Sequence, residues 1–193
     1  TVHLLKQPCK PPIRAEKLLE IDADLRPEGK SGPMVRSLDS YREYYERWAD
    51  TWEFQALLRA RPIAGSYELA AAFVDLINRY RYPSRFEQKQ IIEIRRMKAR
   101  VENERMPRGA DRTRQLKLGR GGLSDVEWIV QLLQLCFAHD YPQLQVTGTI
   151  SALNAAAELG LVEVEDAGTL KDAWRLATKI RGCNVLRTGR ASD

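Results

Sequence analysis

Glu20-Ile21-Asp22-Ala23-Asp24-Leu25-Arg26-Pro27-Glu28-Gly29-Lys30-Ser31-Gly32-Pro33 is the stretch from which the fold is predicted. Apolar and polar residues alternate from 17 to 26, which is typical of a β-strand with one buried face. Two prolines and two glycines then crowd into a seven-residue turn, and residues 34–38 have the character of a short return strand. The sequence therefore predicts a β-hairpin over residues 17–38.

The polar face of the first predicted strand is acidic. Asp22 and Asp24 fall on the same side, about 6.7 Å apart along the strand, and Arg26 ends the row. Carboxylates so close repel one another unless a base or a divalent cation lies among them, and hard cations prefer oxygen ligands. A solvated acidic face and a metal site both remain open on this pattern.

Three ordered segments resemble the glutamine synthetase adenylyltransferase family. Residues 21–35 are similar to its V-D-x-R-L-R-P-x-G-x-x-G-P-L-V segment, although Asp24 stands where many members have arginine. Residues 51–61, TWEFQALLRAR, are similar to T-W-E-x-Q-A-L-x-R-A-R, and residues 117–128, KLGRGGLSDVEW, to K-L-G-x-G-G-[IL]-x-[DE]-[IV]-E-[FW]. A relative that uridylylates a signalling protein shares the general chemistry but fits these segments less well.

The resemblance implies adenylyl transfer, in which a tyrosine hydroxyl of glutamine synthetase attacks the α-phosphorus of ATP and pyrophosphate leaves. It implies Mg²⁺ held by carboxylates, with Asp22 as the third catalytic carboxylate and Asp24 as a further metal-ligand candidate. The residues expected to contact the nucleotide are Arg26, Arg59, Arg61, Lys117, Gly121 and Gly122. Glutamine synthetase and a PII-type nitrogen regulatory protein are the implied partners in this control of nitrogen metabolism.

The last two segments look closer to the family's C-terminal, adenylylating module; the N-terminal module, which removes AMP by phosphorolysis, is the second interpretation. One departure from the family pattern is important: no G-S-x-D-x-D segment, the source of the other two carboxylates, occurs in this sequence. The hairpin is therefore interpreted as the end of a catalytic sheet whose first strands lie outside the sequence. The 193 residues by themselves are expected to be inactive as an adenylyltransferase.

Beyond the hairpin, apolar residues recur at helical spacing. The predicted fold is mainly α, a bundle of about seven helices preceded by a β-hairpin remnant of a nucleotidyltransferase α/β domain. The predicted domains are residues 1–38 and 39–193. An aromatic stripe runs from Leu38 to Trp52, and further helices are expected to about residue 60 and over 67–80, 84–105, 125–139, 150–159 and 166–187.

Several candidate residues also have simple structural explanations. Ser124 and Glu127 have capping-box spacing, and Gly121 and Gly122 can either admit a phosphate to a helix N-terminus or form a tight turn. Arg59 and Arg61 lie two apart, so they cannot share one helical face fully. One of them can reach a phosphate while the other pairs with an acid.

Charge and composition limit the alternatives. The net charge is +5, and residues 89–120 hold eleven Lys or Arg against four acids, a net +7. That segment is interpreted as a solvated helix face or an anion-binding surface. A non-catalytic regulatory module and a helical nucleic-acid-binding domain stay open, although no nucleic-acid partner is expected. Three dispersed cysteines and no long apolar run lead us to expect a cytoplasmic protein without membrane spans.

Overall fold

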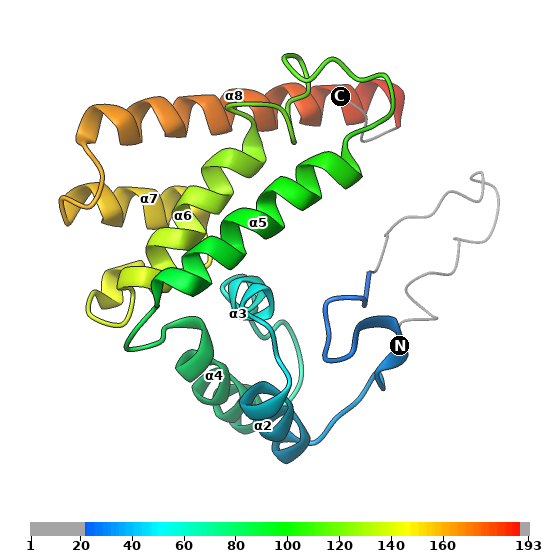
Figure 1. The fold of residues 1–193 in the computed structure, drawn as a ribbon, viewed down its shortest axis with the longest axis vertical. Coiled ribbons are helices and arrows are strands. Elements are labelled where there is room, and N and C mark those ends of the chain that lie inside the picture. The colour runs from blue at the N-terminus through cyan, green and yellow to red at the C-terminus, as the bar shows by residue number, and fades with distance from the viewer. Residues whose placement is uncertain (1–21, 190–193) are drawn as a thin grey trace. The chain divides into compact units, whose positions relative to one another are not determined.

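A computed structural model describes residues 22–189 of the chain (Figure 1). These residues form two compact units that divide between Ala49 and Asp50. The first unit holds a 3₁₀ turn and one helix, and the second holds six α-helices and a 3₁₀ turn. The elements are η1 (Gly29–Ser31), α2 (Leu38–Arg47), α3 (Thr51–Leu57), α4 (Tyr67–Arg81), α5 (Gln88–Arg105), α6 (Leu123–Phe137), η2 (Pro142–Leu144), α7 (Thr149–Glu158) and α8 (Val164–Thr188).

The first unit consists of a compact loop and helix α2. The helix begins where the Ser37 hydroxyl accepts a hydrogen bond from the Ser40 N–H at 3.2 Å, which satisfies a donor of the first turn. Asp39 in the first turn and Arg47 in the last complement the helix dipole. Tyr45 is buried and packs edge-on against Tyr44. The aromatic residues of this segment therefore serve mainly as local core.

The predicted hairpin is not verified by the structure. Residues 17–21 lie outside the described part of the chain, and residues 22–189 contain no strand. Residues 34–37 have no regular structure, and Leu38, predicted to end the return strand, begins α2. A hairpin without further strands is marginal in water, and residues 22–189 supply no strand with which residues 34–38 could pair.

The second unit is built around two apolar clusters. In the first, α3, α5, α6 and α7 contribute residues that include Leu58, Ile94 and Leu135. In the second, α6, α7 and α8 meet through residues that include Val126 and Leu153. Helices α6, α7 and α8 contact one another, and Figure 1 shows α6 between α5 and α7, with α8 (orange to red) along the top of the view. Helices α6 and α7 contribute to both clusters, so they connect the two parts of the core.

Buried polar side chains hold the connections between these helices. The Gln134 amide nitrogen donates to the Leu144 and Val146 carbonyls, both at 2.7 Å, which fixes the connection around η2. The Arg81 guanidinium donates to the Leu57 and Ala60 carbonyls at 3.2 and 3.0 Å, where α3 ends. Burial lowers the pKa of Arg81, although the group stays charged.

The prediction of a mainly α protein is confirmed, with seven α-helices between residues 22 and 189. The predicted helices over 67–80, 150–159 and 166–187 agree with α4, α7 and α8 within two residues. The long aromatic stripe is wrong as one helix, because α2 ends at Arg47 and Asp50 caps a new helix, α3. Within the described residues, no helix has the length and apolar character needed to cross a membrane.

Candidate functional site

The acidic residues of the first unit lie on an exposed loop. Asp22 Oδ1 accepts a hydrogen bond from the Asp24 N–H at 2.8 Å, which fixes the direction of the Asp22 carboxylate. Asp24 Oδ2 lies 3.2 Å from Lys30 Nζ, and both side chains are exposed. The two carboxylates are therefore accessible neighbours, but a lysine already neutralises much of the charge of Asp24.

Arg26 holds the loop closed. Its guanidinium donates to the carbonyls of Gly32 at 3.0 and 3.1 Å, of Lys30 at 3.2 Å, and of Ala23. Gly32 is buried, and a Cβ there would collide with the Pro27 carbonyl oxygen, so the turn requires glycine. Arg26 thus has a structural task in this structure, while its predicted contact with phosphate stays a prediction.

A second arginine in the first unit was missed by the sequence analysis. The Arg36 side chain is only 9% exposed and forms an ion pair with Glu28 at 2.6 Å. Its guanidinium also lies 5.6 Å from the centre of the Tyr44 ring, a cation–π distance. Glu28 has a left-handed backbone with φ 63°, which is uncommon outside glycine, and this ion pair helps to hold it there. Arg36 therefore stabilises the loop that carries Asp22 and Asp24 through its ion pair with Glu28.

The loop offers donors of the kind that Mg²⁺ binds, but too few. Asp22 and Asp24 supply carboxylate oxygens, the preferred ligands of a hard cation. No group of three or more acidic, histidine or cysteine residues suited to a metal occurs among residues 22–189. The chemistry of the donor set thus fits a magnesium site to which this loop contributes one or two ligands.

In the second unit, Arg59 and Arg61 have different surroundings. The Arg59 guanidinium donates to the Thr149 hydroxyl at 2.6 Å and to the Thr147 carbonyl, where α7 begins. Arg61 is exposed in the connection after α3. Arg59 thus contacts a hydroxyl and a carbonyl rather than the acid that was expected for one of the two arginines, and phosphate contact by either of them stays a prediction.

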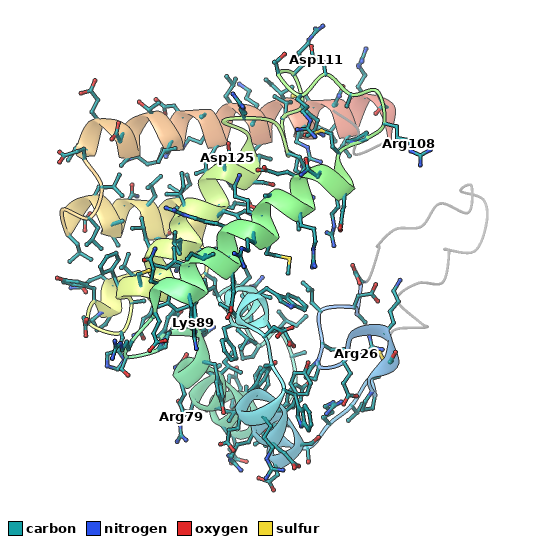
Figure 2. The ribbon with its side chains drawn as sticks, in the orientation of Figure 1. Arg26, Arg79, Lys89, Arg108, Asp111 and Asp125 are labelled. Atoms are coloured by element: carbon teal, nitrogen blue, oxygen red, sulfur yellow. The ribbon has the colours of Figure 1, made fainter. Side chains whose placement is uncertain are left out.

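The glycine-rich segment before α6 is closed by an aspartate. Asp125 Oδ2 accepts a hydrogen bond from the Gly121 N–H at 2.7 Å, and Asp125 Oδ1 lies 2.5 Å from Lys98 Nζ on α5. Figure 2 labels Asp125 at the start of α6, close to α5. Gly122 is the N-cap, and a Cβ there would lie 2.7 Å from the Leu116 carbonyl oxygen. Gly122 thus allows close backbone packing, Gly121 has a left-handed backbone with φ 71°, and the N–H of Gly121 that a phosphate would bind is held by a carboxylate.

Lys98 and Asp125 are the residues of this region that the sequence analysis overlooked. Burial lowers the pKa of Lys98, but the hydrogen bonds that its ammonium donates to Asp125 and Glu102 outweigh this effect and hold the pKa above its ordinary value. Lys117, the predicted phosphate contact, is exposed, and its carbonyl accepts the Ser124 N–H at 2.9 Å. The predicted capping box at Ser124 is wrong, because Ser124 is buried inside α6, past its N-cap.

A pocket of 280 Å³ lies between the start of α3 and one face of α5. It brings two residues of the second motif, Thr51 and Trp52, next to Arg96 and Arg100 of the basic segment. The Thr51 hydroxyl donates to the Glu93 carboxylate at 2.5 Å, which ties the two helices together. The structure thus joins a motif and a charged face that lie more than forty residues apart in the sequence.

Two family models match the chain. One, described as glutamate-ammonia ligase adenylyltransferase, matches residues 3–76, and the other, described as GlnD PII-uridylyltransferase, matches residues 95–193. The similarity to uridylyltransferases is thus stronger in the second half of the chain than the three motifs indicated.

Curated relatives match across both halves. A bifunctional glutamine synthetase adenylyltransferase/adenylyl-removing enzyme of Streptomyces avermitilis is 56% identical over 180 residues, which is 93% of this chain and 18% of the relative. Enzymes of the same name from Streptomyces coelicolor and Corynebacterium efficiens are 53% and 50% identical, over 93% and 91% of this chain and 18% and 17% of their own lengths. The chain thus spans less than a fifth of the length of the relatives it matches, and it belongs to the glutamine synthetase adenylyltransferase family.

Proposed function

We propose that this chain is part of an enzyme that transfers AMP from ATP to a tyrosine of glutamine synthetase. The observation that carries the proposal is the 56% identity, over 93% of the chain, to an enzyme named for that reaction. The same name includes AMP removal, so the reverse, phosphorolytic direction is the second candidate. Because this sequence holds only one of the three expected catalytic carboxylates, Asp22, we expect no transfer by the 193 residues alone.

Asp22 is proposed as the catalytic carboxylate and magnesium ligand. Its Oδ1 is oriented by the Asp24 N–H, so the carboxylate is presented from a fixed turn rather than from a freely rotating side chain. When bound, Mg²⁺ lowers the pKa of the attacking hydroxyl and neutralises charge on the leaving pyrophosphate. Asp24 is the weaker ligand in this proposal, because Lys30 competes for its oxygens at 3.2 Å.

The remaining candidate nucleotide contacts differ in whether their polar groups already hold protein partners. Arg61 has an exposed side chain that can reach a phosphate, whereas Arg26, Gly121 and Gly122 already hold backbone or carboxylate partners. We therefore assign Arg61 to phosphate binding and give the other three a mainly architectural part. Lys117 is exposed and stays a candidate because it belongs to the third motif. Arg59 also has a mainly architectural part, because its guanidinium is engaged at the start of α7.

Glutamine synthetase is the proposed protein substrate, and a PII-type regulatory protein is the proposed effector. The match of residues 95–193 to a PII-uridylyltransferase model supports contact with PII, since that model is named for an enzyme acting on PII. The cytoplasm is the proposed location, which suits the free thiols of Cys136 and Cys183. No nucleic-acid or membrane partner is part of this proposal.

A chimera tests the proposal. The 180 matching residues of the Streptomyces avermitilis relative are replaced by those of this chain, and AMP transfer to glutamine synthetase is followed by mass spectrometry. The chimera is expected to transfer AMP. Asp22→Asn is expected to reduce the rate about 100-fold or more, because a metal ligand that contributes several kcal/mol in the transition state is lost.

Two further variants make the test specific. Asp24→Asn is expected to have a smaller effect than Asp22→Asn, and Asp39→Asn, an equal change of charge on the exposed face of α2, is expected to have none. A folded chimera without transfer in either direction would contradict the proposed function. Full activity of the Asp22→Asn chimera would contradict the role given to that residue.

A further inference from the structure

The pocket between α3 and α5 presents two guanidinium groups without acidic partners. Arg96 and Arg100 lie one turn apart on α5, about 6 Å along the helix axis, so they share a face. Across residues 22–189, neither of them forms an ion pair with a carboxylate. Within the described part of the chain, Arg100 donates a hydrogen bond only to the sulfur of Met97, at 3.2 Å. Two like charges this close favour an anion bound between them.

The neighbouring Lys98 gives the contrast. It lies on the same helix between the two arginines, and it is neutralised by Glu102 and by Asp125 at 2.5 Å. The charges of α5 are therefore paired on the side that packs against α6 and unpaired on the side that lines the pocket. Arginines that line a pocket and form no ion pair with a carboxylate are well suited to bind phosphate groups.

The two carboxylates of the pocket are already engaged by groups of α3. Glu93 accepts the Thr51 hydroxyl, and the Asp50 side chain caps α3 by accepting an N–H of its first turn. Along α5, Glu93 precedes Arg96 by three residues and Arg100 by seven, about 4.5 and 10 Å along the axis. Glu93 is thus the carboxylate of the pocket nearest to Arg96, and it is already engaged by the Thr51 hydroxyl.

The floor of the pocket is apolar. Trp52 and Met97 line the pocket and are partly buried, so a flat ring can pack there while a charged group reaches the arginines. The volume of 280 Å³ is at the lower limit of small-molecule sites, which suits a short polyanion or one end of a larger ligand.

We propose that this pocket binds a polyphosphate group, with Arg96 and Arg100 each pairing with a separate phosphoryl unit. Guanidinium groups bind phosphate oxygens through paired hydrogen bonds, and two of them one turn apart match a ligand with successive phosphoryl groups better than a single carboxylate. The anion site follows from the pocket alone. Only the suggestion that ATP or its pyrophosphate product is the ligand rests on the proposed function.

The experiment is isothermal titration of the 193-residue chain with inorganic pyrophosphate, without divalent cations, at two salt concentrations. Saturable binding of one pyrophosphate per chain is expected, and higher salt is expected to weaken it. Arg96→Gln and Arg100→Gln are each expected to raise the Kd about 10-fold or more, as the loss of a charge-assisted hydrogen bond predicts. Glu93→Gln is expected to lower the Kd, because it removes the nearest negative charge.

Arg95→Gln is the matched control, since Arg95 is an exposed residue of α5 that does not line the pocket. It is expected to change the Kd less than 2-fold. Absence of saturable binding, or an equal loss in the Arg95 variant, overturns the inference. Circular dichroism of each variant verifies that the helix content is retained. If Arg96→Gln or Arg100→Gln keeps this helix content and still binds pyrophosphate with the Kd of the unaltered chain, that arginine does not bind phosphate.

A second titration, with ATP, distinguishes the two sources of the polyphosphate. Tighter binding of ATP than of pyrophosphate, lost in Trp52→Ala, supports a nucleotide whose ring packs on the indole. Equal affinity for both supports a site for the phosphate chain alone. Neither titration requires AMP transfer, so failure of the pocket leaves the Asp22 test in the chimera unaffected, and failure of that test leaves the pocket intact.

Discussion

Replacement of Asp125 by alanine is expected to loosen the connection between α5 and α6. One carboxylate oxygen accepts the Gly121 N–H at 2.7 Å, and the other lies 2.5 Å from Lys98 Nζ. The Asp125 side chain is 26% exposed, so water can replace only part of these interactions. Glu102 remains beside Lys98 in the variant, and no unpaired charge is left behind.

The magnitude follows from these contacts. A hydrogen bond to a charged group contributes about 1.5–3 kcal/mol, and a partly exposed ion pair about 0–1 kcal/mol. With Glu102 retained, the expected loss for Asp125→Ala is about 2–3 kcal/mol in the free energy of unfolding. For a chain of this length, that lowers Tm by roughly 4–12 °C.

Urea unfolding followed by far-ultraviolet circular dichroism measures this loss. Asp39→Ala is the control, because its ion pair with Arg42 on α2 is exposed at 88% and 47% and is expected to contribute less than about 0.5 kcal/mol. A double-mutant cycle with Lys98→Met separates the ion pair from the hydrogen bond to Gly121. If Asp125→Ala is no more destabilising than Asp39→Ala, the assignment of Asp125 as the tie between these helices is wrong.

Three further predictions concern residues away from the proposed site. Gly168→Ala in α8 is expected to raise the free energy of unfolding by about 0.5–1 kcal/mol, because a Cβ there meets nothing within 4 Å and glycine disfavours helix; an unchanged or lower value in urea would contradict this. In a Cys9→Ser background, iodoacetamide is expected to modify the exposed Cys183 before Cys136, because burial raises the pKa of the Cys136 thiol. Peptide mass spectrometry gives the order of labelling, and faster labelling of Cys136 would refute this prediction. Because the pKa of Lys98 is raised above 10.5, its stabilisation is present below that pH and is lost as the pH rises through the higher folded value. The difference in Tm between the native chain and Lys98→Met should therefore shrink in strongly alkaline buffer, and a constant difference would count against the ion pair.

The helices were predictable from the sequence because their signals are local. Apolar spacing located α4, α7 and α8 within two residues. The start of α5 was placed at Ser84, but Glu87 is the N-cap and forms a capping box with Gln90. Several residues near a helix start can satisfy its free N–H groups, so spacing alone does not decide among them.

The break between α2 and α3 shows a different limit. The aromatic residues from Leu38 to Trp52 keep helical spacing across it, yet Asp50 caps a new helix and reciprocally bonds Glu53. The cap at Asp50 stabilises the start of a new helix at the expense of a longer α2. The spacing of apolar residues contains no information about this cap. Trp48, the C-cap residue of α2, is 72% exposed although it belongs to the aromatic stripe.

The candidate site was less predictable, because its contacts join residues far apart in the chain. Thr51 meets Glu93 across 42 positions, and Lys98 meets Asp125 across 27. Residue type indicated which groups could bind phosphate, but not which of them are already neutralised by a neighbour. The pairing of Lys98 and the exposure of Arg96 emerge only when α5 is packed against α3 and α6.

The position of Arg59 has a consequence for interpreting mutants of this enzyme family. The residue belongs to the second motif, yet its guanidinium joins the end of α3 to Thr147 and Thr149, 88 and 90 positions later. A variant that loses this arginine would lose activity through misassembly of the bundle even if the arginine never meets ATP. Kinetic deficits at Arg59 therefore become informative about chemistry only after the melting temperature of the same variant has been matched to that of the parent.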